Sequence, residues 1–153
     1  MDFWKMNGAP KDFIILNNCQ ENLPETTFPI LAKTLCDPVT SLGADGLLVA
    51  DKGQGRVFAA LYDREGSRKA LDESSARCIC RFARELGLSG QQLQVETPEG
   101  PILGQQVDRR SYRVRLGSED PWSQGTTNLV ARGEILDEDL PDLYWLLGGS
   151  LCL

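Results

Sequence analysis

Residues 72–88 read Asp-Glu-Ser-Ser-Ala-Arg-Cys-Ile-Cys-Arg-Phe-Ala-Arg-Glu-Leu-Gly-Leu, and they contain the clearest helix signal in the chain. Apolar side chains recur there at helical spacing, namely at Ala76, Ile79, Cys80, Ala83 and Leu86. A glycine follows at position 87, where helices commonly end. The pattern predicts a helix over residues 73–86 with one broad apolar face.

Arginines define another face of the same helix, at Arg77, Arg81 and Arg84. Glu73 precedes Arg77 by four residues, which is favourable spacing for an ion pair. Glu85 follows Arg81 by the same interval. We therefore predict a solvated face crossed by ion pairs rather than a binding patch.

Asp72 immediately precedes this helix, within the segment Asp-Glu-Ser-Ser. An aspartate carboxylate at the N-cap accepts a backbone N–H from the first turn, and we expect Ser74 or Ser75 to donate it. The plain interpretation of Asp72 is therefore a helix cap rather than a catalytic group.

Short apolar segments with turn residues between them surround the helix in the sequence. They predict strands over residues 3–6, 13–16, 46–50, 57–62, 93–97, 102–107, 112–116 and 129–135. A second helix is predicted over residues 27–36, and residues 117–128 have the composition of a loop. Strands wrapped about one well-marked helix predict the α+β fold class.

We expect residues 1–153 to form a single lobe. The apolar segments 144–147 and 151–153 are candidates for a strand that completes its sheet. If these segments do not pack, truncation of a longer gene is favoured.

Composition excludes several classes of partner. The chain has 153 residues, 41% hydrophobic and 25% charged, which suits one core. Its net charge is −6 and no basic block stands out, which argues against nucleic-acid binding. No apolar run is long enough to span a bilayer, and residues 1–5 lack the pattern of a secretory signal. We expect a cytoplasmic protein with no nucleic-acid or membrane partner.

Two residue types limit the chemistry. The chain has no histidine, which removes Ser-His-Asp and Cys-His dyads, most catalytic zinc sites and the easiest general base near neutral pH. Its five cysteines are an odd number at no metal-ligand spacing, so we expect them to be reduced and expect no metal or cofactor. Cys78 and Cys80 lie inside the helix, where we predict core packing.

Three stretches carry a family resemblance through their order and spacing. Residues 3–8 read Phe-Trp-Lys-Met-Asn-Gly and lead to Asp12-Phe13; Cys36-Asp37 precedes Gly-Ala-Asp-Gly-Leu-Leu at 43–48; Gly66-Ser67 precedes Ala76-Arg77-Cys78. These stretches resemble the motifs Phe-x-Lys-Met-x-Gly-x-Gly-Asn-Asp-Phe, Cys-Asp-Arg…Gly-Ala-Asp-Gly-Leu-Leu and Asn-x-Asp-Gly-Ser…Cys-Gly-Asn-Gly-x-Arg-Cys of the diaminopimelate epimerase family. The likeness covers about residues 1–120.

The resemblance implies a lobe in which a twisted, barrel-like, mostly antiparallel sheet wraps a central helix, here residues 73–86. A full epimerase of this family has two such lobes facing each other across the substrate. It is a cofactor-independent isomerase that converts LL- to meso-diaminopimelate in lysine biosynthesis, with one cysteine per lobe. A helix N-terminus suits this chemistry because it stabilises a thiolate and binds a carboxylate.

Matched to the family's motifs, the expected contact positions carry other residues here. Counting back from the third stretch, the catalytic cysteine falls on Asp72, and the Gly-Asn that would hold the substrate carboxylate falls on Glu73-Ser74. The substrate-binding asparagines fall on Lys11 and Asp63. The resemblance therefore implies the fold of an epimerase, degenerate or truncated and inactive by itself.

These replacements would bring three carboxylates, of Asp63, Asp72 and Glu73, to a place where the family binds an anionic group. We expect Lys11 to offset this charge by pairing with Asp72 or Glu73.

Two other functions remain open. One is a homodimeric isomerase in which Asp72 or Glu73 shuttles protons, since phenazine-biosynthesis isomerases of the same two-lobed fold are understood to use carboxylates. A lone lobe would expose the face that meets a second lobe, which favours a homodimer. The other is a non-catalytic binding or scaffold module.

Overall fold

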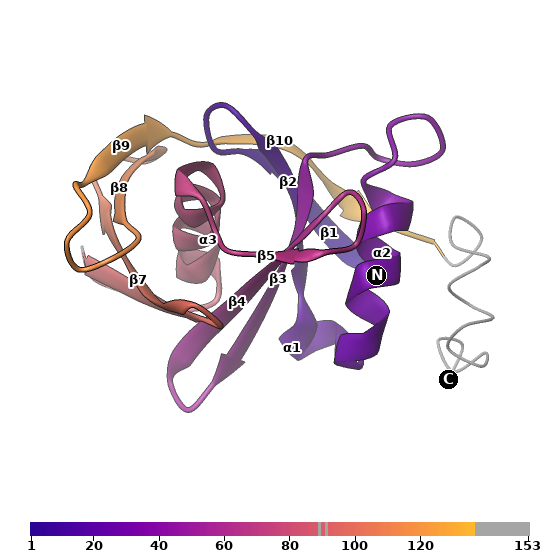
Figure 1. The fold of residues 1–153 in the computed structure, drawn as a ribbon, viewed down its shortest axis with the longest axis horizontal. Coiled ribbons are helices and arrows are strands. Elements are labelled where there is room, and N and C mark those ends of the chain that lie inside the picture. The colour runs from indigo at the N-terminus through magenta and orange to yellow at the C-terminus, as the bar shows by residue number, and fades with distance from the viewer. Residues whose placement is uncertain (89, 91, 137–153) are drawn as a thin grey trace.

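A ten-stranded sheet curves around one helix, α3 (Glu73–Glu85), as Figure 1 shows. The computed structural model describes residues 1–88, 90 and 92–136. The predicted α+β class, with a barrel-like sheet around a central helix near residues 73–86, is confirmed.

The strands follow the order β10-β1-β2-β3-β4-β6-β7-β8-β9, with β5 paired to β4 at the side. Their bounds are β1 (Asp2–Asn7), β2 (Asp12–Asn17), β3 (Gly46–Gly53), β4 (Arg56–Asp63), β5 (Arg68–Lys69), β6 (Gln92–Thr97), β7 (Gly100–Gln106), β8 (Ser111–Arg115), β9 (Ser123–Thr126) and β10 (Asn128–Glu134). Neighbours are antiparallel except for β2 with β3 and β4 with β6.

The two ends of the sheet are joined by the chain itself. Strand β9 pairs with β8, and β10 pairs with β1 at the opposite end of the strand order. Only Thr127 separates β9 from β10, and this residue is fully buried. The chain therefore passes directly from one end of the sheet to the other and nearly closes it around α3.

Three short helical segments lie before β3: α1 (Asn18–Glu21), the 3₁₀ turn η1 (Glu25–Thr27) and α2 (Phe28–Leu35). The predicted helix over 27–36 corresponds to α2, which carries Pro29 in its first turn, where proline is tolerated. Figure 1 shows α2 on the opposite side of the sheet from α3. No helix of the described part of the chain is long and apolar enough to cross a membrane.

The sheet has a hydrophobic cluster on each face. Leu48 and Ala50 of β3 pack on the α3 side, whereas Leu47 and Val49 pack on the α2 side. A strand buried on both faces reads as a continuous apolar run, which explains the unbroken segment 46–50.

The structure departs from the predicted elements in a few places. The predicted loop 117–128 contains β9, whose residues Ser-Gln-Gly-Thr have no apolar alternation and are ordered by pairing with β8. The short elements α1 and β5 carried no periodic signal. The predicted apolar segments 144–147 and 151–153 lie outside the described residues.

Candidate functional site

The site begins at the first turn of α3, where Asp72 is the N-cap. The Ser75 backbone N–H donates to Asp72 Oδ1 at 2.8 Å, and the Ser75 hydroxyl donates to the same oxygen at 2.7 Å. In return, the backbone N–H of Asp72 donates to Ser75 Oγ at 2.8 Å. The predicted cap is therefore confirmed, with Ser75 as the donor.

The second carboxylate oxygen of Asp72 is bound by Lys11, whose Nζ lies 2.9 Å from Oδ2. The expected pairing of Lys11 is thereby confirmed, with Asp72 rather than Glu73. Burial opposes ionisation of Asp72, but the bonds from Ser75 and Lys11 outweigh it, so the pKa of Asp72 lies below its usual value. The hydrogen bond to Asp72, and then its charge, raise the pKa of Lys11.

A surface hollow beside the Lys11–Asp72 pair is lined by some of the site residues that the sequence predicted. Lys11, Asp63 and Asp72 all line it, although they lie far apart in sequence. Glu73 and Ser74 are not among its lining residues. Glu73 is exposed and its Oε2 accepts a 2.7 Å hydrogen bond from the Ser123 hydroxyl, while Ser74 is buried.

The charge of the hollow is nearly balanced, unlike the acidic site expected from the sequence. Its charged lining residues are Lys11, Arg64, Lys69, Asp45, Asp63, Glu65 and Asp72. Arg64 pairs with Asp45 at 3.2 Å, and Lys69 lies 3.8 Å from Asp63. Sequence reasoning missed these two cations because Lys69 reaches the site through the two-residue strand β5, and Arg64 lies in the turn before it.

Asp63 holds the turn between β4 and β5. Its Oδ1 accepts the backbone N–H groups of Glu65 at 3.0 Å and of Ser67 at 2.9 Å. Such side-chain bonds to the following backbone are the ordinary way in which aspartate stabilises a turn. Together with the Lys69 contact, they give Asp63 a structural role in the described structure.

The face of α3 that was predicted to be solvated is buried at Arg77, whereas Arg81 and Arg84 are half-buried. Arg77 is 5% exposed, and its Nε and Nη2 donate to the carbonyl oxygens of Gly8 (3.0 Å) and Ala9 (2.8 Å). Its Nη1 donates to Ser123 Oγ at 3.1 Å. The prediction was wrong because the β1–β2 turn and β9 pack over this face, and their buried polar groups need donors.

The predicted ion pairs along α3 are also absent. Within the described part of the chain, Glu73 is connected to Arg77 through Ser123, and Arg81 donates to the Thr127 carbonyl at 3.2 Å rather than to Glu85. Tertiary contacts thus replaced both local pairs.

The cysteines within α3 take no part in this site. Cys78 and Cys80 are fully buried, as predicted for core residues, and burial raises the pKa of the Cys80 thiol to about 12. Burial also raises the pKa of Cys78. No cluster of three or more histidine, cysteine or carboxylate side chains suited to a metal was found over residues 1–88, 90 and 92–136.

The curated relatives of the chain are diaminopimelate epimerases, although no protein-family model matches it. The epimerase of Moorella thermoacetica is 38% identical over 104 residues, which cover 67% of this chain and 37% of the relative. The epimerase of Desulforudis audaxviator is 34% identical over 122 residues, which cover 76% of this chain and 44% of the relative. The epimerase of Methanopyrus kandleri is 29% identical over 145 residues, which cover 79% of this chain and 52% of the relative. The chain spans about half the length of these relatives or less.

Solved structures of phenazine biosynthesis proteins of the PhzF family share the fold. The Bacillus anthracis protein has a TM-score of 0.58 at 12% identity, over 75% of this chain and 40% of that chain. The Enterococcus faecalis protein has a TM-score of 0.57 at 9% identity, over 74% of this chain and 42% of that chain. These structural matches concern the fold alone, whereas the sequence matches identify the lineage. The chain is therefore diaminopimelate-epimerase-like, and the likeness extends over about half of the length of these relatives or less.

Proposed function

We propose that this lobe keeps the architecture of a diaminopimelate-epimerase-like isomerase but performs no proton transfer at the start of α3. The observation that carries the proposal is the commitment of both Asp72 oxygens. One oxygen caps the helix through Ser75, and the other binds Lys11. The family resemblance assigns this position to the catalytic cysteine.

The electrostatics of Asp72 support the proposal. A general base works best when its pKa lies near the pH of the reaction. The pKa of Asp72 is instead lowered by the groups that hold it. An α-hydrogen of an amino acid is a weak acid, so a carboxylate of lowered basicity at this position is a poor group to remove it.

The cap also competes with a bound carboxylate. In the family, the resemblance implies that N–H groups at this helix start hold the substrate's α-carboxylate. Here the Ser75 N–H donates to the Asp72 side chain at 2.8 Å. Asp72 therefore stands where a ligand anion would bind and supplies the negative charge itself.

The test is α-hydrogen exchange in deuterated water, followed by proton NMR with LL- and meso-diaminopimelate, with a two-lobed epimerase as the positive control. We expect no exchange from the purified chain. Sedimentation at the assay concentration reports whether it is a monomer or a homodimer, so an active dimer would be recognised.

Asp72→Asn is the matched variant, because asparagine is an equally good N-cap but not a base. Exchange by the wild-type chain that disappears in a folded Asp72→Asn protein would overturn the proposal. That outcome would identify a carboxylate-based isomerase instead.

A further inference from the structure

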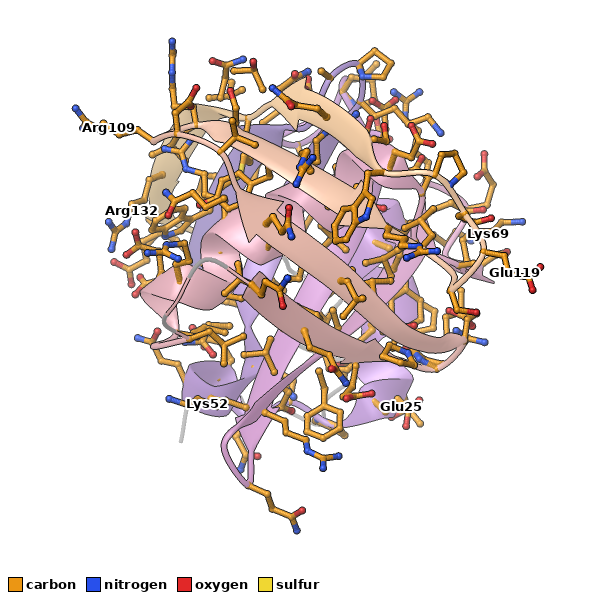
Figure 2. The ribbon with its side chains drawn as sticks, turned by 90° about the vertical axis from the view of Figure 1, so that its left-hand side faces the viewer. Glu25, Lys52, Lys69, Arg109, Glu119 and Arg132 are labelled. Atoms are coloured by element: carbon orange, nitrogen blue, oxygen red, sulfur yellow. The ribbon has the colours of Figure 1, made fainter. Side chains whose placement is uncertain are left out.

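Three arginines line a second hollow, which shares no lining residue with the hollow beside the Lys11–Asp72 pair. They are Arg81 of α3 and Arg109 and Arg110 of the β7–β8 turn, and the hollow measures about 460 Å³. That volume falls in the range of small-molecule sites, roughly 300–1,000 Å³. In Figure 2 the labelled Arg109 extends outward from the ribbon, on the same side of the view as Arg132.

No carboxylate forms an ion pair with this cluster in the described structure, although the charge of Asp108 acts on Arg110. None of the three guanidinium groups has an acidic side chain within salt-bridge distance over residues 1–88, 90 and 92–136. The carboxylate of the same turn, Asp108, is occupied otherwise, since its Oδ1 accepts the N–H groups of Arg110 (3.0 Å) and Ser111 (2.8 Å). Asp108 therefore shapes the turn that presents Arg109 and Arg110.

The contrast with the first hollow is direct. There, each of Lys11, Arg64 and Lys69 faces a carboxylate. Here, three like charges line one hollow of a protein whose net charge is −6. Like charges that share one hollow repel each other, and a bound anion would remove that repulsion.

Two of the arginines are positioned by one buried residue, Thr127. Arg81 Nη1 donates to both the carbonyl oxygen and the Oγ1 of Thr127 at 3.2 Å. Thr127 in turn donates to the Arg110 carbonyl from its backbone N–H (2.7 Å) and its hydroxyl (2.6 Å). The closure of the sheet between β9 and β10 thus holds both sides of the hollow in a defined arrangement.

Arg81 and Arg110 also have guanidinium N–H donors that no described residue accepts. A guanidinium group carries five N–H donors. Among the described residues, the side-chain hydrogen bonds of Arg81 and Arg110 use only Nη1 in each, and Asn128 Oδ1 is the acceptor for Arg110 at 3.3 Å. Guanidinium groups bind phosphate oxygens through paired N–H donors, which makes arginine the preferred residue for such groups. We propose that this hollow binds a small molecule carrying phosphate groups. The proposal does not depend on the function assigned to the α3 N-terminus.

The test is isothermal titration of the full chain with inorganic pyrophosphate, in the wild type and in R109Q/R110Q. We expect saturable one-to-one binding that weakens by about ten-fold or more in the double variant, because hydrogen bonds to charged groups are lost. R56Q is the matched control, since it removes one exposed arginine from the start of β4, outside the hollow. It should change the affinity by less than about two-fold.

Amide NMR chemical shifts provide a second measurement. The amide signals of Thr127, which is hydrogen-bonded to Arg81 and Arg110, and of Ser111, which follows Arg110, should shift on titration. Absence of saturable binding to the wild type, or equal weakening in R56Q and R109Q/R110Q, would overturn the proposal. A single-stranded oligonucleotide that binds more tightly than pyrophosphate through the same arginines would also overturn it, in favour of a nucleic-acid partner.

Discussion

Lys11 Nζ lies 2.9 Å from Asp72 Oδ2, although 61 positions separate the two residues. The contact joins the β1–β2 turn to the residue that begins α3. It places a cation against the helix cap at the position where the family resemblance expects a catalytic cysteine. The same two side chains line the hollow beside the helix start.

Removing the cap should destabilise the fold. We expect Asp72→Ala to lower the free energy of unfolding by about 1–2 kcal/mol, because the Ser75 N–H loses its acceptor. Asp72→Asn should cost less than half of this, since the amide oxygen still caps the helix. Urea denaturation measures both, with Asp120→Ala as a control at an exposed loop residue. Equal loss in the Asn and Ala variants would contradict the cap as the main role of Asp72.

The pH range over which the Lys11–Asp72 pair stabilises the fold follows from its pKa shifts. The pKa of Asp72 is lowered in the folded protein. Its contribution to the free energy of unfolding is therefore present above the unfolded-state pKa of about 3.9 and disappears as pH falls through the folded-state pKa. The pKa of Lys11 is raised, so its contribution is present below about 10.4 and disappears as pH rises through the folded value.

The stability difference between the wild type and Lys11→Met should therefore be flat from about pH 5 to 9 and shrink at both extremes. It should not exceed about 1 kcal/mol, because both side chains are partly exposed. Urea denaturation across this pH range measures the difference, and Lys33→Met is the control. A difference that peaks at one end of the range would show that another group dominates.

Gly8 is the residue at which the β1–β2 turn approaches α3. A Cβ atom there would lie 2.1 Å from the Ser74 carbonyl oxygen and 2.8 Å from Cys78 Sγ. We expect Gly8→Ala to destabilise the protein by about 2–3 kcal/mol, because turn and helix backbone must separate. Gly53→Ala is the matched control, since its new Cβ would meet nothing closer than Phe58 Cε2 at 3.9 Å. Thermal unfolding of both variants checks the difference, and equal melting temperatures would refute it.

Arg77 should be among the polar side chains that matter most to stability. Arg77→Met keeps much of the side-chain volume but leaves the carbonyl oxygens of Gly8 and Ala9 without these donors. We expect a loss of about 3 kcal/mol or more, since each hydrogen bond to a charged group contributes about 1.5–3 kcal/mol. Arg56→Met, at an exposed position, should change the unfolding free energy by less than about 0.5 kcal/mol. Similar effects of the two substitutions would mean that the buried contacts of Arg77 are not rigidly formed.

Among the described cysteines, Cys19 should be the one that reacts in the folded protein. It is exposed, whereas Cys36, Cys78 and Cys80 are buried. Partial burial and the hydrogen bond to Asp51 raise the pKa of Cys19, so alkylation by iodoacetamide should be slow at neutral pH and accelerate above about pH 9.

Peptide mapping by mass spectrometry after brief labelling distinguishes these cysteines, and the same reaction in urea is the control. Asp51→Asn should increase the rate at Cys19 by removing a negative charge 3.1 Å from the thiol. Native labelling of Cys36 or Cys78 would contradict the buried positions described here.

The sequence predicted the elements whose signals are local. Helix α3 was identified within one residue at its C-terminal end because its apolar spacing, its Asp72 cap and Gly87 lie within one continuous segment. β9 was missed because its stability comes from pairing with β8, and pairing partners leave no mark on a short polar segment.

The same division applies to the candidate site. Local chemistry predicted Asp72 as a cap, and motif matching predicted that Lys11 pairs with Asp72 or Glu73, between which the structure decided for Asp72. The sequence did not place Arg64 and Lys69 in the hollow, because the turn and short strand that carry them form only against β4.

Local chemistry therefore determined the central helix, its cap and the α+β class, since each depends on residues within a few positions of one another. Tertiary structure alone decided the fate of the α3 arginines. Their spacing suited exposed ion pairs. Instead, Arg77 is buried under the β1–β2 turn and donates to the carbonyl oxygen of Gly8, and Arg81 donates to the carbonyl oxygen of the buried Thr127. A buried carbonyl oxygen without a donor costs more than a surface ion pair contributes, so the fold redirected these side chains from local carboxylates to distant backbone.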